Sequence, residues 1–269
     1  MLSMFSYPFM QRALIVGLMV SVCAALLGVT LVLKRFSMIG DGLSHVGFGA
    51  LSVGAAAGLA PMYIAAPAVL ISAVLLLRLS RREERGRVSG DAATAVLSST
   101  ALAIGVIAAS LGKLNVDVNS YMFGSVLAVS ASDTVICVVI CSAVLILYLL
   151  FYNTIFAVTF DETFAAAGGM KTGLVSTAMA AVTALTVVVG RRLMGTLLIS
   201  ALRVFPAISA MKICRSWRGT VICSVSLAAA GFVAGLISAF AFSLPTGPAV
   251  VAADAVIYGV CSAADRIRR

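Results

Sequence analysis

Long apolar runs, separated by short polar segments, make up most of this sequence. Each run has the length that a helix rising about 1.5 Å per residue needs to cross roughly 30 Å of hydrocarbon. The pattern predicts nine membrane-spanning helices, at residues 13–33, 37–58, 61–77, 92–111, 133–151, 172–189, 193–211, 219–240 and 247–263. The less apolar stretch 112–132 predicts a short surface or re-entrant helix within 121–129. We therefore expect an all-α polytopic membrane protein with eight or nine transmembrane helices, forming one domain over residues 1–269.

The composition agrees with this pattern. Hydrophobic residues make up 62% of the 269 positions and charged residues 11%, against about 45–50% and 25% in ordinary soluble proteins. A soluble protein of this size would expose large apolar patches. Soluble enzymes, disordered proteins and disulfide scaffolds are therefore excluded. The cysteines have no CxxC spacing and are interpreted as small buried hydrophobes: Cys23, Cys137, Cys141, Cys214, Cys223 and Cys261.

The basic residues predict the orientation in the membrane. Lys and Arg gather in cytoplasmic loops, and of the 19 basic residues 14 fall on one side of the predicted spans, four on the other and one, Arg203, within a span. The 14 are Lys34, Arg35, Arg78, Arg81, Arg82, Arg85, Arg87, Lys171, Lys212, Arg215, Arg218, Arg266, Arg268 and Arg269, and the four are Arg12, Lys113, Arg191 and Arg192. We expect a bacterial cell-membrane protein with a cytoplasmic carboxyl terminus, an external amino terminus and long cytoplasmic loops at 78–91 and 152–171. The net charge of +9 then reflects membrane topology rather than nucleic-acid binding.

Two titratable residues inside a predicted span, Asp41 and His45, are spaced i, i+4 and share one helix face near the middle of the bilayer. Titratable groups at such depth are costly and need a reason. Nearby glycines leave the helix slim enough for close packing or for a pathway beside it. One interpretation is a hydrogen bond that ties two helices together. The other is a metal site, because a carboxylate and an imidazole suit a borderline transition metal. Two ligands do not complete a tetrahedral zinc site, so this second interpretation requires a second copy of the chain.

Arg203 and Asp254 are the other charges within predicted spans. An unpaired charge at such depth would be very costly. We interpret the two residues as partners in a buried ion pair. The alternative is that Arg203 lines a pathway as a fixed cation.

The cytoplasmic segment 160–169 predicts a short helix rich in alanine. Asp161 and Glu162 provide a start signal, and Gly168 with Gly169 a stop signal. The helix is either an ordinary loop element or a surface that docks a partner. The sequence contains no GxxxxGKS or GxxxxGKT phosphate loop, GxSxG or HExxH motif, so we expect the chain itself not to be an enzyme.

Three motifs resemble those of the membrane subunits of zinc-, manganese- and iron(II)-importing ABC transporters. Residues 34–45 are similar to the family's basic-pair–Met-Ser-x-x-Gly-Asp-x-x-x-His signature. Residues 117–127 resemble its Asp-x-x-x-Tyr-Leu-Phe-Gly-x-x-Leu segment, and 160–169 its cytoplasmic Asp-x-x-Phe-Ala-x-x-x-Gly element.

Two further motifs follow in the same order. Residues 195–210 resemble the family's Gly-x-Leu-Leu…Pro-Ala-x-x-Ala helix, and 245–248 match its Pro-x-Gly-Pro turn. These two are most similar to the zinc-type permeases. Arg203 is a departure, because the family usually has an aliphatic residue there.

The resemblance implies a type II ABC importer permease that is homodimeric or pseudo-dimeric, with a pathway along the twofold axis. Two ATPase subunits would bind the cytoplasmic face, and an external binding protein would deliver the ion. Asp41 and His45 would line the pathway as metal ligands, without a permanently bound cofactor. The segment 160–169 would be the coupling helix that the ATPase receives, through Phe160, Asp161, Glu162, Phe164, Ala165 and Gly168.

The leading hypothesis is therefore the permease of an ATP-driven importer of a divalent transition metal, zinc first and manganese or iron second. The main alternative is an ion-coupled secondary carrier that uses Asp41 and His45 as a proton or metal relay. A neighbouring gene for a Walker-A ATPase would distinguish the two. A purely structural membrane protein would not need a polar pair at this depth, and an importer of a large organic cofactor gives no reason for one.

Overall fold

A computed structural model of the chain describes residues 7–34, 36–59, 61–80, 90–112 and 129–268, and the regular structure within these ranges is helical. Each of the nine predicted spans coincides with a helix whose ends differ from the prediction by a few residues. Seven of the described helices are long and apolar enough to cross a membrane. The all-α polytopic prediction is confirmed. The helix predicted within 121–129 falls outside the described residues except for Val129.

The helices gather into two compact units, which interleave along the chain. The first comprises Met1–Leu33, Asn119–Phe156 and Val189–Arg269, and the second comprises Lys34–Val118 and Ala157–Val188. Because each unit draws on separate stretches of sequence, neither corresponds to a continuous piece of the chain.

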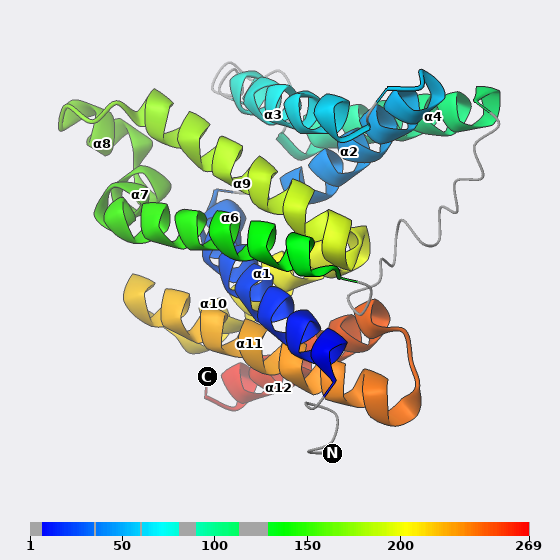
Figure 1. Ribbon diagram of the computed structural model, residues 1–269. Coiled ribbons are helices and arrows are strands. Elements are labelled where there is room, and N and C mark those ends of the chain that lie inside the picture. The colour runs from blue at the N-terminus through cyan, green and yellow to red at the C-terminus, as the bar shows by residue number, and fades with distance from the viewer. Residues whose placement is uncertain (1–6, 35, 60, 81–89, 113–128, 269) are drawn as a thin grey trace. The chain divides into compact units, whose positions relative to one another are not determined.

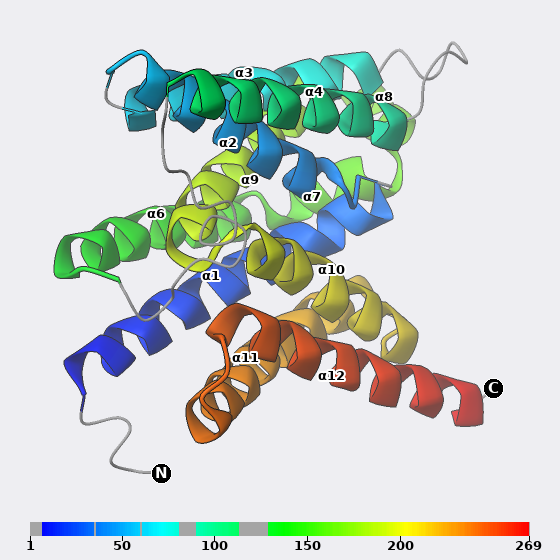
Figure 2. The same cartoon turned by 90° about the vertical axis from the view of Figure 1, so that its right-hand side faces the viewer.

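The central helix of the first unit is α1 (Pro8–Leu33), which contacts α6 (Ala131–Leu150), α10 (Thr196–Ile213) and α11 (Trp217–Phe242) (Figure 1). The second half of α1 is almost entirely buried. A helix that is apolar all round can be covered on every side, which explains this central place. The last helix, α12 (Thr246–Arg268), packs against α10 and α11 (Figure 2).

Small residues allow these helices to approach closely. A methyl group added at Gly17 of α1 would overlap the ring of Phe232, and one added at Gly28 would overlap the backbone carbonyl of Arg203. Such contacts are typical of membrane helices, where close van der Waals packing replaces the hydrophobic effect as the force between helices.

The second unit contains α2 (Ile39–Ala56), α3 (Pro61–Ser80) and α4 (Gly90–Leu111), with α2 in contact with both of the others. It also contains the short helix α8 (Glu162–Ala167) and most of α9 (Thr172–Met194). The α2 helix is not among the seven strongly apolar helices, and Ile64–Leu76 is the apolar stretch described in α3. Polar residues and glycines dilute the hydropathy of α2.

A helix that the sequence did not predict, α7 (Tyr152–Phe160), follows α6 directly. The ring centroids of Tyr152 and Phe156 lie 6.3 Å and 5.7 Å from that of Trp217, at the start of α11. These aromatic contacts attach the start of α7 to the first unit, because such pairs add to the burial of their surface.

Candidate metal site and coupling helix

Asp41 and His45 lie in the first two turns of α2, and their side chains share one face as predicted. The Nε2 atom of His45 is 3.5 Å from the Oδ2 atom of Asp41. Two ligand atoms that each lie about 2.1 Å from one tetrahedral metal ion are roughly 3.4 Å apart. The pair is therefore spaced to chelate a single ion with little rearrangement.

The pair is partly accessible from this chain. The side chains of His45 and Asp41 are 21% and 39% exposed, whereas Nδ1 of His45 is buried without a hydrogen-bond partner in the part of the chain that is described. Among all the residues that the structure describes, no group of three His, Cys, Asp or Glu side chains could hold a metal. Asp41 and His45 thus offer two side chains of the kind that ligate metals, and a four-ligand site would need two more from elsewhere.

The face of α2 beside this pair packs closely against α4, as the glycines predicted. A methyl group at Gly42 would press on the Thr94 side chain, and one at Gly49 would overlap the backbone carbonyl of Ala101. The second contact lies seven residues after the first on both helices, at Gly49 on α2 and at Ala101 on α4. The two helices therefore run in the same direction. Gly105 of α4 lies just as close to α2, so that small residues on both helices set the position of the metal-ligand pair.

Arg203 and Asp254 are both buried, each with 2% of its surface exposed. The ion pair between them stays a prediction. The Cγ atom of Arg203 packs against Gly28 of α1, whereas the Asp254 carboxylate lies against Gly231 of α11. The two side chains thus face different neighbouring helices.

The segment 160–169 forms the predicted short helix, α8. The Asp161 carboxylate caps its first turn and accepts hydrogen bonds from the Thr163 hydroxyl at 2.6 Å and from the Phe164 N–H at 2.8 Å. The bond from Thr163 and then that from Phe164 hold the pKa of Asp161 below its usual value, because both stabilise the ionised form. The start signal in the sequence is confirmed.

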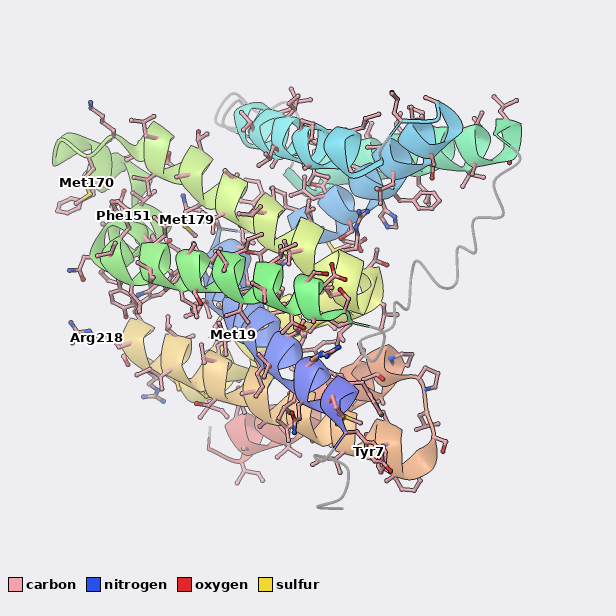
Figure 3. All side chains as sticks on the ribbon, in the orientation of Figure 1. Tyr7, Met19, Phe151, Met170, Met179 and Arg218 are labelled. Carbon is pink, nitrogen blue, oxygen red and sulfur yellow. The ribbon has the colours of Figure 1, made fainter. Side chains whose placement is uncertain are left out.

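The stop signal of α8 is confirmed as well. Gly168 follows the last helical residue, and Gly169 has a φ of 83°, a left-handed conformation that favours glycine. Met170 follows in the turn into α9 (Figure 3). Its N–H donates to the Ala165 carbonyl at 3.1 Å, which closes this turn. The turn joins α8 tightly to α9.

Two large apolar side chains are exposed on α8 and immediately before it. Phe164 is 75% exposed and Phe160 is 60% exposed, whereas Ala165 is 2% exposed and supports α8 from within. Large apolar side chains that gather on a connection between spans indicate a surface for a partner protein. Phe164 is therefore accessible at the surface of α8, whereas Ala165 is covered.

The structure also reveals a contact that the sequence did not predict. The Nζ atom of Lys34 is 3.5 Å from the Glu162 carboxylate on α8 and 3.4 Å from the Ser176 hydroxyl on α9. The sequence indicated Lys34 as one of many basic residues on the cytoplasmic side and as part of the basic pair that begins the 34–45 motif. No local pattern could have found this contact, because its partners are more than a hundred residues away.

These features define a class of protein: a polytopic helical membrane protein with an aspartate–histidine pair in one helix and an exposed short helix between two others. Such a combination is typical of the membrane subunit of a transporter. The model of one family, described as the ABC 3 transport family, matches residues 6–264. The chain belongs to the ABC 3 transport family.

Individual relatives extend over nearly the whole chain. The "Probable metal transport system membrane protein" of Thermotoga maritima is 30% identical over 246 residues, 91% of this chain and 86% of that protein. The manganese transport system membrane protein MntC of Listeria monocytogenes is 26% identical over 252 residues, 94% of this chain and 89% of that protein. The solved structure of PsaBC from Streptococcus pneumoniae in complex with Fab contains a chain with a TM-score of 0.83 and 26% identity, covering 97% of this chain and 93% of that one.

Family membership confirms the resemblance found in the sequence. The chain is a membrane-embedded permease subunit of an ABC transporter and not an enzyme, since ATP hydrolysis belongs to a separate subunit of such transporters. The alternative of an ion-coupled secondary carrier is not supported. The two relatives named above refer to manganese and to an unspecified metal, so the similarity to zinc-type permeases stays a prediction.

Proposed function

We propose that this chain carries a divalent transition metal ion into the bacterial cytoplasm, as the permease of an ATP-driven importer. The observation that carries the proposal is the Asp41–His45 pair, whose ligand atoms lie 3.5 Å apart on a helix that would cross the membrane. A carboxylate and an imidazole at this spacing suit one metal ion, and the names of the relatives support a metal as cargo.

Two copies of the chain complete the site in this proposal. Each contributes one imidazole nitrogen and one carboxylate oxygen, so that a twofold axis beside α2 generates a set of two nitrogens and two oxygens. While the ion is bound, the imidazole is neutral and the carboxylate ionised. The partial exposure of both side chains in the single chain supports this arrangement.

The remaining parts of the transporter bind at opposite ends. An ATPase subunit receives α8 at the cytoplasmic face, where Phe164 is exposed, and an external binding protein delivers the ion to the other face. ATP turnover then moves α8 and opens the site inward. This orientation follows from the distribution of basic residues.

The identity of the metal is the finer part of the proposal. The sequence motifs favour zinc, the name of the Listeria relative favours manganese, and the ligand types accept both as well as iron(II). Zinc is placed first, with manganese and iron(II) next. The metal content of the purified complex, after exposure to each ion alone, distinguishes them.

The decisive experiment measures metal binding and uptake by the assembled transporter. His45→Ala should remove metal from the permease and stop uptake, and Asp41→Asn should do the same less completely, because a carbonyl oxygen still coordinates weakly. Asp133→Asn is the matched control, since this carboxylate lies in the first turn of α6. A His45→Ala transporter that accumulates zinc, manganese and iron at the wild-type rate would show that the pair is not the site.

A further inference from the structure

Lys34 is the first residue of the second unit, where it contacts two of that unit's helices. It follows the last residue of α1, and its ammonium group reaches Glu162 on α8 at 3.5 Å and Ser176 on α9 at 3.4 Å. The side chain of Lys34 is 18% exposed and that of Glu162 is 42% exposed. The lysine is thus held between the short helix and the next helix of the same unit.

The contact does little for the stability of the protein. An ion pair with one partner this exposed is screened by water and loses side-chain entropy, so its net contribution to folding is small. A single acceptor would also have sufficed to satisfy the charge. The contact instead fixes the start of the second unit to both α8 and α9.

The other side of Lys34 leads directly into the metal-ligand helix. A tight turn follows, in which the Ile39 N–H donates to the Phe36 carbonyl at 3.3 Å and the Gly42 N–H donates to the Met38 carbonyl at 3.0 Å. Asp41 lies in the first turn of α2. Only six residues separate Lys34 from Asp41 in the chain, and the hydrogen bonds that begin at Phe36 hold the turn rigid, so a displacement of Lys34 is passed to Asp41.

The same holds on the side of α8. The turn between α8 and α9 is closed by the hydrogen bond from the Met170 N–H to the Ala165 carbonyl at 3.1 Å. The buried Ala165 side chain holds α8 against its neighbours. Force applied to the exposed Phe164 ring therefore moves α8 as a body, together with Glu162.

We propose that Lys34 is a positioning residue whose ion pair with Glu162 transmits the movement of α8 to the start of α2, and so couples ATP turnover to the Asp41–His45 pair. The inference rests on the proposed function, in which α8 is the coupling helix. It adds the route by which a push on α8 reaches the metal ligands.

The test compares charge reversals in the complete transporter, reconstituted in vesicles with its ATPase and supplied with zinc or manganese. Metal uptake and ATP hydrolysis are measured in the same vesicles. Lys34→Glu and Glu162→Lys should each lower the metal moved per ATP by about two- to fivefold, the factor that corresponds to a partly exposed ion pair. The double variant, with the pair reversed, should restore the wild-type ratio.

Lys171→Glu is the matched control, since it makes the same charge change at an exposed position of the α8–α9 turn. It should leave the ratio unchanged. Metal binding by the isolated permease should be unaffected by Lys34→Glu, which a merely structural role would not predict. If charge reversal prevents membrane insertion, Lys34→Gln removes the pair with less disturbance and should lower the ratio to the same extent.

Single variants that couple normally, or a double variant no better than the singles, would overturn the inference. Phe164→Asp separates this failure from a failure of the proposed function. If Phe164→Asp uncouples transport while the Lys34 and Glu162 variants do not, α8 is the coupling helix but Lys34 is not its link to α2. If Phe164→Asp also couples normally, α8 is not the coupling helix.

Discussion

Gly105→Ala tests whether the contact between α4 and α2 positions the metal ligands. A Cβ atom at this position would lie 2.8 Å from the Cα atom of Gly49 and 2.8 Å from the Cδ1 atom of Phe48, whereas carbon atoms in contact are about 3.5–4.0 Å apart. The helices must therefore separate by roughly 0.7 Å or more. Gly49 is one turn beyond His45 on the same helix, so the displacement reaches the site.

The magnitude follows from a comparison with Gly259→Ala on α12, where an added Cβ atom meets nothing within 4 Å. Both substitutions gain about 1 kcal/mol of helix preference. Only Gly105→Ala overfills a packed contact, at a cost of about 1–3 kcal/mol. The difference in unfolding free energy between the two variants therefore isolates that cost.

Metal binding should follow the same displacement. A binding site must be held to within about 0.5 Å of its working geometry. If metal binding loses half of this packing cost from its free energy, the affinity for zinc or manganese decreases by about two- to tenfold. Titration of the purified permease with each metal, together with its thermal unfolding, measures both effects. A Gly105→Ala permease that is as stable and binds metal as tightly as Gly259→Ala would refute the reasoning.

Three further predictions concern the short helix and the orientation. Phe164→Asp should abolish metal-stimulated ATP hydrolysis and metal uptake but leave metal binding intact. Phe242 is similarly exposed at 72%, and Phe242→Asp should leave ATP hydrolysis and uptake unchanged. Equal losses in both variants would contradict a coupling role for α8. The pKa of Asp161 is lowered on folding, so the hydrogen bond that caps α8 is fully present above the ordinary carboxyl pKa and is lost only as the pH falls through the lower pKa of the folded protein. Hydrogen exchange of the Phe164 N–H, corrected for its intrinsic rate, should therefore stay slow until the pH reaches that lower pKa. Single cysteines at Met170 and Leu244, in a background without the six native ones, should label from the cytoplasmic and external faces respectively, and labelling of both from one side would reject the orientation.

The spans could be predicted from the sequence because hydropathy in a membrane protein is a local property. Each run of apolar residues had to become a helix, since a lipid environment leaves no other way to satisfy the backbone. The α8 helix was also visible, because Asp161 and Gly168 act within a single turn. Its neighbour α7 was missed because its apolar residues continue those of α6 and because its anchor, Trp217, is distant in sequence.

The contacts between side chains could not be predicted in the same way. Arg203 and Asp254 each lie deep in a span, but the sequence could not show that they pack beside Gly28 and Gly231. Which face of a helix meets which neighbour depends on packing that no single segment encodes. The same limit hid the contact of Lys34 with Glu162, since the sequence placed the two residues in separate motifs with nothing to connect them.

The polar pair explains why α2 is a weaker membrane span than its neighbours. Asp41 and His45, together with several glycines, keep α2 out of the set of seven strongly apolar helices. A helix with two such residues gains less from lipid and must be held in the membrane by other means. The structure provides these in the close contacts of Gly42 and Gly49 with α4, which are available only because the glycines carry no side chain. The polar residues that form the proposed metal site therefore require the glycines that make α2 slim. A change to either should disturb the position of Asp41 and His45 before it disturbs the fold.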